Sequence, residues 1–474
     1  MATGIAGLDL VLGGGLEPGA TVVLAGAPGT GKTILAQQMC FATAGRRCVY
    51  YTTISQPHAR LVRHLETFGF FDPRALGTRV EQIHLGEFLQ PDLPGGLGPM
   101  VAEIVRKAMD EHPAIVVLDS AKMLREFADE RELRRALFEM VGRFSQTGAV
   151  LLLVGEYTPD ELGGGIEFSL ADGIIQLDHE ARMPVDRRGL RIIKMRGGSF
   201  VPGRHALQIG SSGIEVFPRI ETLTPAMVTP VSRQVRSTGV AGLDELMGGG
   251  TRRGDSTLVM GPSGVGKTTF GLRFITEELE LGEQCLFVTF QDTPELLLEK
   301  ATGFGWDVGS AMASGQLVIS YVPMGDLDLD VLAATIRAHV DEHPVSRIVI
   351  DSLAELVSAA REWDRLPAYL RSLIGIIQAS GSSLMVTSET PHHEAVSRSV
   401  DGLMFLFDNV IDLRYIEQGS QLGRAINIVK MRKSAHLMTL NTFAITSRGI
   451  VVGDKLEGVT GRLGRSALRT QSPL

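Results

Sequence analysis

A chain of 474 residues, with 44% hydrophobic and 21% charged side chains, has the balance of an ordinary globular protein and room for two or three domains. Its net charge of −8 and pI of about 5.8 argue against a broad nucleic-acid surface, which usually makes a domain basic. Its three cysteines lack metal-ligand spacing and predict no disulfide framework. With no signal-peptide pattern and no apolar run of ~20 residues, we expect a cytoplasmic protein without a membrane span.

Near the N-terminus, a Gly-rich segment follows an apolar run and precedes a helical one. Residues 26–33 fit the G-x-x-x-x-G-K-[ST] pattern of a phosphate-binding P-loop. The run 21–25 predicts a buried strand, and residues 34–44 predict a helix that ends at Gly45. Backbone N–H groups of such a loop and the helix N-terminus together bind phosphate oxygens. The expected nucleotide-binding residues are Gly29, Thr30, Gly31, Lys32 and Thr33, with Lys32 also needed for catalysis.

The same pattern returns 235 positions later, so a chance Gly-rich turn is a poor explanation. Residues 261–268 fit it again and follow the apolar run 257–260. Lys267 is the counterpart of Lys32 in phosphate binding and in catalysis. The expected nucleotide-binding residues of this copy are Gly264, Val265, Gly266, Lys267, Thr268 and Thr269.

Other segments repeat at nearly the same offset, which indicates a duplicated unit. A Thr-Gly-x-x-Gly-Leu-Asp opening occurs at 3–9 and 238–244, and Lys-Met-Arg occurs at 194–196 and 430–432. In each copy, apolar β-rich runs alternate with helical stretches, which predicts an α/β fold with a mostly parallel sheet and helices on both faces. The β-rich runs of the first copy are 21–25, 48–52, 115–118, 150–154 and 174–177.

A segment with no clear periodicity separates the two copies. It contains Pro225 and Pro230, and proline favours an extended linker. We therefore expect a domain over 1–222, a linker over 223–236, and a second domain over 237–474 that ends in a short polar tail.

Each copy also holds an apolar run that ends in an aspartate, as in a Walker B motif. The runs 115–118 and 348–350 end in Asp119 and Asp351. Alone, such a run usually marks only a strand end, but each of these follows its P-loop by about 85 residues. An aspartate in that place holds Mg²⁺ together with the P-loop hydroxyl. The expected metal-site residues are Thr33, Asp119, Thr268 and Asp351.

The two copies differ where hydrolysis would need a group that orients or deprotonates water. After the strand that follows the P-loop helix, the first copy has Ile54 and Ser55, whereas the second has Gln291 and Asp292. We therefore place the catalytic candidates in the second copy. Glu156 and Glu389, each at the end of a later apolar run, are further candidates, with a solvated strand end or a salt bridge as the alternative.

The Lys-x-Arg pairs put two cations on one face of a strand, because side chains alternate along it. Such a pair often marks only a solvated edge strand. Since Lys194 and Arg196 recur as Lys430 and Arg432, we favour contact with phosphate. They lie far along the chain from their own P-loops, so we expect them to reach the nucleotide of a neighbouring subunit, as arginine fingers do.

These residues together resemble the KaiC family, the circadian-clock ATPases and their bacterial and archaeal relatives. The resemblance rests on the two openings, both P-loops, both Walker B strands, both Lys-Met-Arg segments and the Arg-Ala-Ile-Asn run at 424–427. It implies two tandem RecA-like P-loop NTPase domains, CI and CII. It also implies a double-ringed homohexamer with ATP and Mg²⁺ at subunit interfaces, where the neighbour's Lys-Met-Arg strand contacts the phosphates.

The chain departs from the family at two functional points. The clock proteins carry two adjacent glutamates as general bases after the strand that follows each P-loop helix, where this chain has Ile54-Ser55 and Gln291-Asp292. They also carry an adjacent Ser-Thr pair of autophosphorylation sites, where this chain has Met404 and Phe405. Neither side chain accepts phosphate, although Ser397 and Ser399 lie nearby, and the tail is shorter than the one that binds KaiA.

We therefore expect an ATP-binding homohexamer with slow hydrolysis, mainly in CII, and a regulatory role with KaiB-like or other signalling partners. Asp292 is the preferred base, although aspartate is one methylene shorter than glutamate, and CI would hold nucleotide as part of the subunit interface. Three alternatives remain open. They are a clock-type serine/threonine autokinase, a non-hydrolysing scaffold whose assembly ATP controls, and a RecA-like DNA motor, which the acidic charge disfavours.

Overall fold

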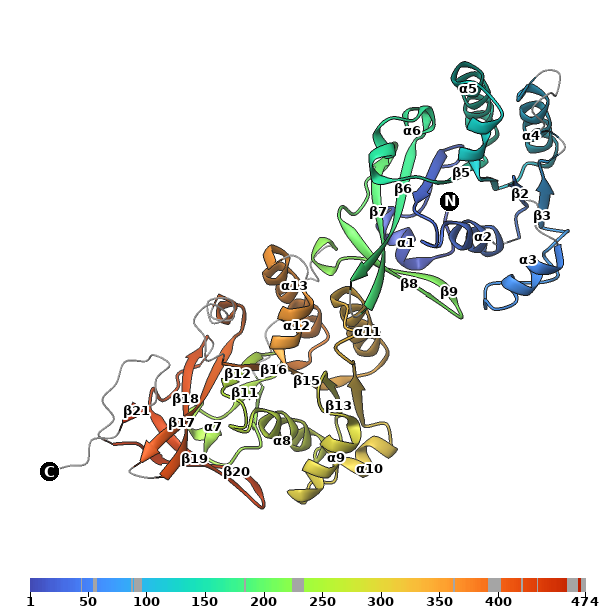
Figure 1. Ribbon diagram of the computed structural model, residues 1–474. Coiled ribbons are helices and arrows are strands. Elements are labelled where there is room, and N and C mark those ends of the chain that lie inside the picture. The colour runs from blue at the N-terminus through green and yellow to red at the C-terminus, as the bar shows by residue number, and fades with distance from the viewer. Residues whose placement is uncertain are drawn as a thin grey trace. The chain divides into compact units, whose positions relative to one another are not determined.

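The chain divides into two compact units, Met1–Leu223 and Thr224–Leu474 (Figure 1). No helix among the described residues is both long and apolar enough to cross a bilayer. The computed structural model describes residues 1–43, 45–53, 58–86, 88, 96–182, 185–223, 234–360, 363–390, 402–418, 421–432, 434–457 and 468–469.

A nine-stranded sheet forms the centre of the N-terminal unit. Its strands are β1 (Thr21–Gly26), β2 (Cys48–Thr52), β3 (Val80–His84), β4 (Ile115–Asp119), β5 (Val150–Glu156), β6 (Gly173–Arg182), β7 (Val185–Met195), β8 (Arg204–Gly210) and β9 (Gly213–Phe217). The order across the sheet is β3-β2-β4-β5-β1-β6-β7-β8-β9. Neighbours from β3 to β6 run parallel, and those from β6 to β9 run antiparallel.

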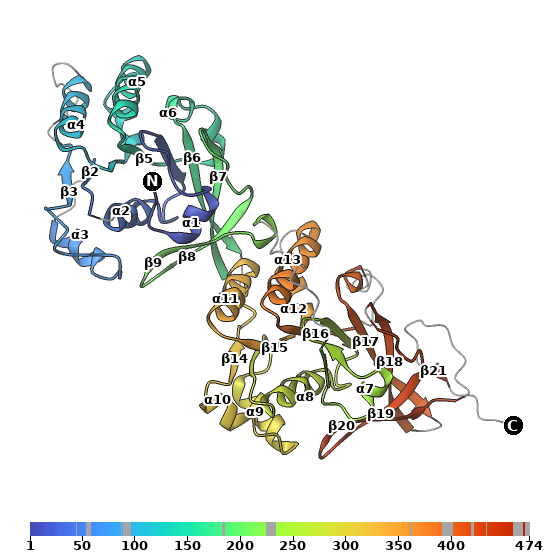
Figure 2. The ribbon, with the colours of Figure 1, turned by 180° about the vertical axis from the view of Figure 1, so that it is seen from behind.

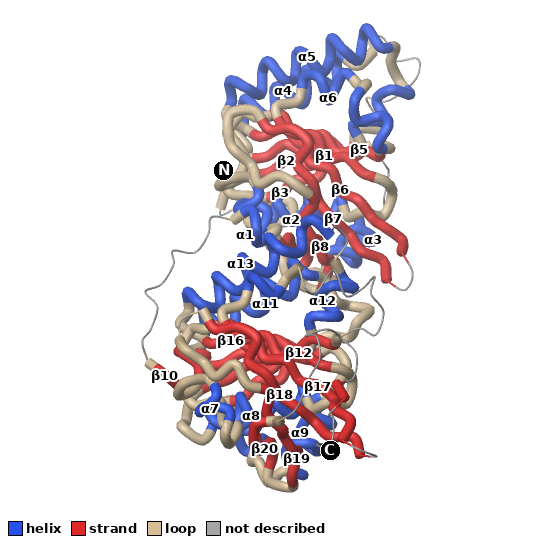
Figure 3. Tube along the Cα trace, turned by 90° about the vertical axis from the view of Figure 1, so that its left-hand side faces the viewer, coloured by secondary structure: helices blue, strands red, loops and turns tan. Residues whose placement is uncertain are grey.

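Helices cover both faces of this sheet (Figure 3). They are α1 (Ala6–Val11), α2 (Lys32–Ala42), α3 (His58–Leu65), α4 (Gly98–Glu111), α5 (Glu130–Thr147) and α6 (Ile166–Leu170), with 3₁₀ turns η1 (Ala121–Glu126), η2 (Pro159–Gly163) and η3 (Ile220–Thr222). α4 and α5 lie side by side on one face, whereas α1 and α2 lie on the other (Figures 1 and 2).

Strand β1 shows why the sheet needs both layers. Its side chains alternate, so Val22 and Leu24 pack with α2, while Val23 and Ala25 pack on the opposite face with α5. Every residue of β1 is buried, as expected for a central parallel strand covered on both faces. The P-loop therefore follows a strand that is buried along its whole length.

The C-terminal unit repeats this plan with a ten-stranded sheet. Its strands are β12 (Ser256–Gly261), β13 (Gln284–Thr289), β14 (Leu317–Tyr321), β15 (Val345–Asp351), β16 (Ser383–Glu389), β17 (Asn409–Gln418), β18 (Gln421–Met431), β19 (Leu440–Thr446), β20 (Gly449–Lys455) and β21 (Leu468–Arg469). The order is β14-β13-β15-β16-β12-β17-β18-β19-β20, and β21 pairs with β17. Strands β10 (Val235–Arg236) and β11 (Thr251–Arg252) form a separate pair.

The helices of this unit also lie on both faces of its sheet (Figure 3). α7, α8 and α9 cover one face, and α11, α12 and α13 cover the other. Their bounds are α7 (Leu243–Leu246), α8 (Lys267–Leu279), α9 (Pro294–Gly303), α10 (Val308–Ala313), α11 (Leu329–Glu342), α12 (Leu353–Ala359) and α13 (Leu366–Ala379), with 3₁₀ turns η4 (Trp363–Arg365) and η5 (Met404–Leu406).

The repeated Thr-Gly-x-x-Gly-Leu-Asp opening has a structural role. Asp9 Oδ1 accepts a hydrogen bond from the backbone N–H of Thr3 at 2.7 Å, and Asp244 does the same for Thr238 at 2.8 Å. A Cβ on Gly7 would lie 1.7 Å from the carbonyl oxygen of Val216 in β9. The motif therefore fixes how the chain enters each unit.

The predicted α/β fold class is confirmed, and the five predicted β-rich runs of the first copy correspond to β1, β2, β4, β5 and β6. The helix after the first P-loop begins earlier than predicted, at Lys32, because Gly31 adopts the left-handed conformation that starts it. The short strand β3 and the antiparallel strands β8 and β9 were not among the predicted runs. Most of the expected linker and tail lies outside the described residues.

Candidate functional site

The first P-loop closes around its own lysine. Gly29 and Gly31 have φ of +76° and +100°, a left-handed conformation that L side chains rarely adopt. Lys32 begins α2, is 6% exposed, and donates from Nζ to the carbonyl oxygen of Ala27 at 2.8 Å. Burial lowers the pKa of Lys32, while the charges of Glu156 and Asp119 raise it. A buried ammonium among backbone groups is suited to an anionic ligand.

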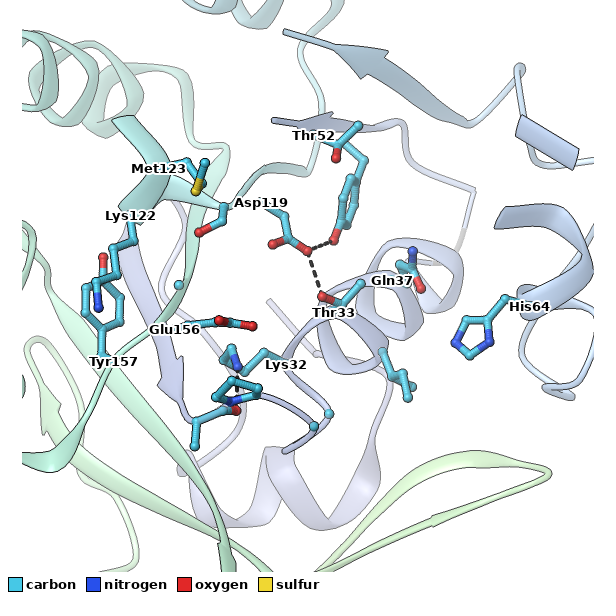
Figure 4. Close-up of a pocket in the computed structure, with 18 of the residues that line it drawn as sticks. Lys32, Thr33, Gln37, Thr52, His64, Asp119, Lys122, Met123, Glu156 and Tyr157 are labelled. Carbon is cyan, nitrogen blue, oxygen red and sulfur yellow. Dashed lines mark hydrogen bonds between the residues drawn. The ribbon is translucent and has the colours of Figure 1, made fainter. Parts of the chain in front are cut away.

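A cavity of about 1290 Å³ opens beside this loop (Figure 4). Its walls come from the P-loop and from the carboxyl ends of β2, β3, β4 and β5, where parallel α/β sheets bind ligands. Glu156, at the end of β5, lies over Lys32 (Figure 4). Gln37 of α2 also lines the cavity, and its buried Oε1 has no hydrogen-bond partner among the described residues. The cavity is large enough for a nucleotide.

The predicted metal-site residues of this unit meet at one point. The hydroxyl of Thr33 donates to Oδ2 of Asp119 at 2.8 Å, and the hydroxyl of Tyr50 donates to the same oxygen at 2.5 Å (Figure 4). Burial raises the pKa of Tyr50, and the charge of Asp119 raises it further. A carboxylate beside the P-loop hydroxyl fits Mg²⁺, which prefers oxygen ligands.

The C-terminal unit assembles the same set. Lys267 Nζ donates to the carbonyl oxygens of Gly261 and Pro262, both at 3.0 Å, and burial lowers the pKa of Lys267. Thr268 donates to Oδ2 of Asp351 at 2.7 Å, and Thr387 donates to Oδ1. In each unit the peptide bond after the Walker B aspartate is cis.

The two catalytic candidates of the second copy have different environments. Gln291 Nε2 donates to Oε1 of Glu355, the third residue of α12. Asp292 accepts from Nζ of Lys300 in α9 at 2.5 Å, which makes an ion pair. The corresponding residues of the first copy, Ile54 and Ser55, lie outside the described residues, as do Ser397 and Ser399.

Each of the four predicted cations contacts a group of its own unit, which is a backbone carbonyl for three of them and a carboxylate for Arg196. Lys194 Nζ donates to Phe168 O at 3.2 Å, and Lys430 Nζ donates to Phe407 O at 2.7 Å. Arg196 lies 3.9 Å from Asp172, and Arg432 donates to Phe405 O. Neither Lys194 nor Arg196 is among the described residues that line the N-terminal cavity. Met404 and Phe405, which we expect at the positions of the family's phosphate acceptors, lie in η5.

Three residues at these sites were missed from the sequence. Tyr50 and Thr387 hold the Walker B carboxylates across neighbouring strands, a relationship that no local pattern displays. Glu355 was detectable, because Ser352 and Glu355 fit the S-x-x-E capping box that begins a helix. Glu389 acts on Lys267, since its charge raises the pKa of that lysine.

The chain is similar to several curated proteins along nearly its whole length. The circadian clock oscillator protein KaiC of Parathermosynechococcus lividus is 26% identical over 475 residues, covering 96% of this chain and 86% of the relative. The circadian clock protein KaiC3 of Synechocystis is 27% identical over 487 residues, covering 99% and 95%. KaiC of Synechococcus elongatus is 27% identical over 475 residues, covering 96% and 89%.

A family model described as the KaiC ATPase matches twice, over residues 1–221 and 236–457. Each match contains one P-loop, one Walker B aspartate and one Lys-Met-Arg segment. The chain therefore belongs to the KaiC ATPase family, with one copy of the ATPase unit in each half.

Proposed function

We propose that each unit binds one ATP with Mg²⁺ and that the chain is a slow, regulatory ATPase. The observation that carries this proposal is the same in both units, namely a lysine that donates to carbonyl oxygens of its own P-loop next to a Thr–Asp hydrogen bond. Thr33 with Asp119, and Thr268 with Asp351, would hold the Mg²⁺, whose charge would offset that of the phosphates. The P-loop residues already named would bind the phosphates through backbone N–H groups.

We further propose that hydrolysis occurs mainly in the C-terminal unit, the CII domain of the family. This unit offers the polar residues Gln291 and Asp292 after β13, whereas the first copy has the residues Ile54 and Ser55 at that place in the sequence. CI would then mainly hold nucleotide. The absence of the family's glutamate pair from both copies supports a slow rate, because no general base of the usual reach is present.

We also propose a nucleotide-dependent homohexamer in which Lys194, Arg196, Lys430 and Arg432 reach the phosphates of a neighbouring subunit. Their recurrence in both units supports this role. Regulatory function and KaiB-like or other signalling partners are proposed by analogy with relatives that are named as circadian clock proteins. Light scattering with and without ATP and Mg²⁺ tests the assembly.

Phosphate release by the wild type, Lys32→Ala and Lys267→Ala tests the enzymatic part. Lys267→Ala should lose most of the activity, while Lys32→Ala should keep most of it and weaken assembly. Lys455→Ala is a matched control, because Lys455 is an exposed lysine at the end of β20. Full activity in Lys267→Ala would show that CII is not the main site of hydrolysis.

A second candidate is a scaffold whose assembly depends on ATP that it does not hydrolyse. The ion pair between Asp292 and Lys300 favours it, because a carboxylate held by a lysine is not free to contact the attacking water. ATP-dependent hexamers without Lys267-dependent phosphate release would support this function over the first.

A further inference from the structure

A hydrogen bond between Gln291 and Glu355 links the end of β13 to the start of α12. The donor is Nε2 of Gln291 and the acceptor is Oε1 of Glu355. Gln291 is exposed, whereas Glu355 is only 5% exposed. A buried carboxylate therefore holds an amide that is open to solvent.

Glu355 is fixed by a second set of contacts. Its Oε2 accepts from the hydroxyl of Ser352 at 2.5 Å and from the backbone N–H of Ser352 at 3.2 Å. Ser352 directly follows Asp351, so the carboxylate lies beside the predicted metal site. The charge of Glu355 also acts on Lys267 and on Asp351. Glu355 therefore caps α12 and also lies close enough to Lys267 and Asp351 for its charge to affect them.

The carboxylate determines how the amide of Gln291 is oriented. An ionised carboxylate only accepts hydrogen bonds, so the NH₂ group of Gln291 must face Glu355. The amide carbonyl oxygen then points away from Glu355 and can accept a hydrogen bond from water. Asp292 is differently placed, because its carboxylate is paired with Lys300.

The sequence of the N-terminal unit has no glutamate at the position of Glu355. The residue four positions after the Walker B aspartate is Met123 in that unit and Glu355 in the other. Met123 lines the N-terminal cavity and cannot orient an amide through an ionic hydrogen bond (Figure 4). This difference between Met123 and Glu355 is consistent with the proposal that hydrolysis occurs mainly in CII.

We propose that Gln291 positions the attacking water in CII and that Glu355 is the positioning residue that orients Gln291, an inference that rests on the proposed ATPase function. The oxygen of the water bonds to the γ-phosphorus, and the bond from that phosphorus to the β,γ-bridging oxygen breaks. ADP leaves with the bonding electrons. One proton of the water stays on the phosphate, and the other passes to solvent. Gln291 takes up no proton and only fixes the direction of attack.

The test measures kcat and KM for phosphate release in the full-length chain with ATP and Mg²⁺. Gln291→Ala should lower kcat about 10-fold or more with KM within twofold of wild type, because only the water loses a contact. Glu355→Gln should lower kcat several-fold. The double variant should be no slower than Gln291→Ala alone, since Glu355 acts through Gln291.

Two matched controls isolate the pair. Gln284→Ala removes a glutamine at the other end of β13, and Glu299→Gln removes an exposed carboxylate on α9. Both should keep wild-type kcat. Unfolding temperatures of all variants identify losses caused by misfolding, and Glu355→Asp tests the reach of the carboxylate if Glu355→Gln unfolds.

The inference and the proposed function fail in different ways. If wild type releases no more phosphate than Lys267→Ala, the proposed hydrolysis in CII is wrong and the inference falls with it. If wild type is active and Gln291→Ala keeps its kcat within threefold, only the inference is wrong. Additive losses in the double variant would also overturn it, because Glu355 would then act independently of Gln291.

Discussion

The hydroxyl of Tyr50 donates to Oδ2 of Asp119 at 2.5 Å, so the Walker B carboxylate of the N-terminal unit is held from strand β2. In the C-terminal unit the equivalent carboxylate, Asp351, is held from β16 by the hydroxyl of Thr387. The residue that corresponds to Tyr50 is Phe287, which has no hydroxyl. The hydroxyl that donates to the Walker B carboxylate therefore comes from different strands in the two units.

The first prediction concerns this hydrogen bond. Tyr50→Phe should lower the unfolding free energy of the nucleotide-free N-terminal unit by about 1.5–3 kcal/mol, the usual loss for a hydrogen bond to a charged group. Calorimetry measures this loss of unfolding free energy. Both tryptophans, Trp306 and Trp363, lie in the C-terminal unit. The unfolding of that unit, followed by tryptophan fluorescence, should therefore be the same in Tyr50→Phe as in the wild type.

Tyr51→Phe is the matched control for this prediction. Tyr51 lies on the opposite face of β2, and its buried hydroxyl has no partner among the described residues. Removing it should be neutral or stabilise the unit by up to about 1 kcal/mol, because an unpaired buried polar group is lost. Equal losses in the two variants would contradict a specific role for the contact with Asp119.

The second prediction concerns Asp351 and pH. Burial raises the pKa of Asp351 above 3.8, although the hydroxyls of Thr387 and Thr268 oppose this. As pH rises from 3.8, the unfolded chain loses this proton before the folded one, so the contribution of Asp351 to stability falls until its folded pKa and is constant above it. Asp351→Asn should therefore raise the unfolding free energy of the nucleotide-free unit at neutral pH by about 1 kcal/mol.

Urea unfolding followed by tryptophan fluorescence at several pH values measures this effect as the difference between variant and wild type. The difference should grow with pH above 3.8 and then level off. Asp341→Asn is the control, because Asp341 is 65% exposed and only weakly paired with Arg337. Asp351→Asn should also lose the stabilisation that the proposed binding of Mg²⁺ and ATP would give to the wild type. A variant less stable than wild type at neutral pH would contradict the sign of the prediction.

The third prediction concerns a buried ion pair beneath the C-terminal sheet. Arg347 and Glu278 are 2% and 1% exposed, and Nε lies 2.9 Å from Oε2. Glu278→Gln should cost about 3–5 kcal/mol in unfolding free energy, because it leaves the guanidinium buried without its counter-charge. Glu280→Gln, which removes a 61% exposed carboxylate paired with Arg273, should cost less than about 1 kcal/mol. Urea unfolding followed by tryptophan fluorescence measures the loss of unfolding free energy in both variants. Similar losses would contradict the argument that burial makes the first pair matter more.

Most of the parallel half of the N-terminal sheet could be predicted from the sequence, because its strands are buried on both faces and form short apolar runs. Val150–Glu156 is an example, with its first six residues buried. The parallel strand β3 was missed because it is only partly buried. The antiparallel strands are harder to recognise, because polar residues interrupt their apolar runs, as in Arg204–Gly210. Their edges also depend on pairing across distant parts of the chain.

The P-loops and Walker B residues were predictable because their chemistry requires fixed residue types in a fixed local order. The residues that support them were not, because Tyr50 and Thr387 reach the carboxylates across neighbouring strands. The ion pair between Asp292 and Lys300 could not be predicted either, because nothing in the sequence around Asp292 indicates it. Side-chain direction at a strand end is set by tertiary packing and not by local sequence.

The last prediction concerns the repeated opening motif. A Cβ on Gly7 would lie 1.7 Å from the carbonyl oxygen of Val216, which is backbone and cannot rotate away. Gly7→Ala should therefore destabilise the N-terminal unit by about 1–3 kcal/mol, as overpacking does. Gly142→Ala is the matched control, because this glycine lies within α5 and an added Cβ meets no atom within 4 Å. That substitution should stabilise the unit by up to about 1 kcal/mol, since alanine favours helix. In calorimetry, the unfolding temperature of the N-terminal unit should thus fall in Gly7→Ala and rise in Gly142→Ala. An unchanged unfolding temperature in Gly7→Ala would show that α1 does not need this close approach to β9.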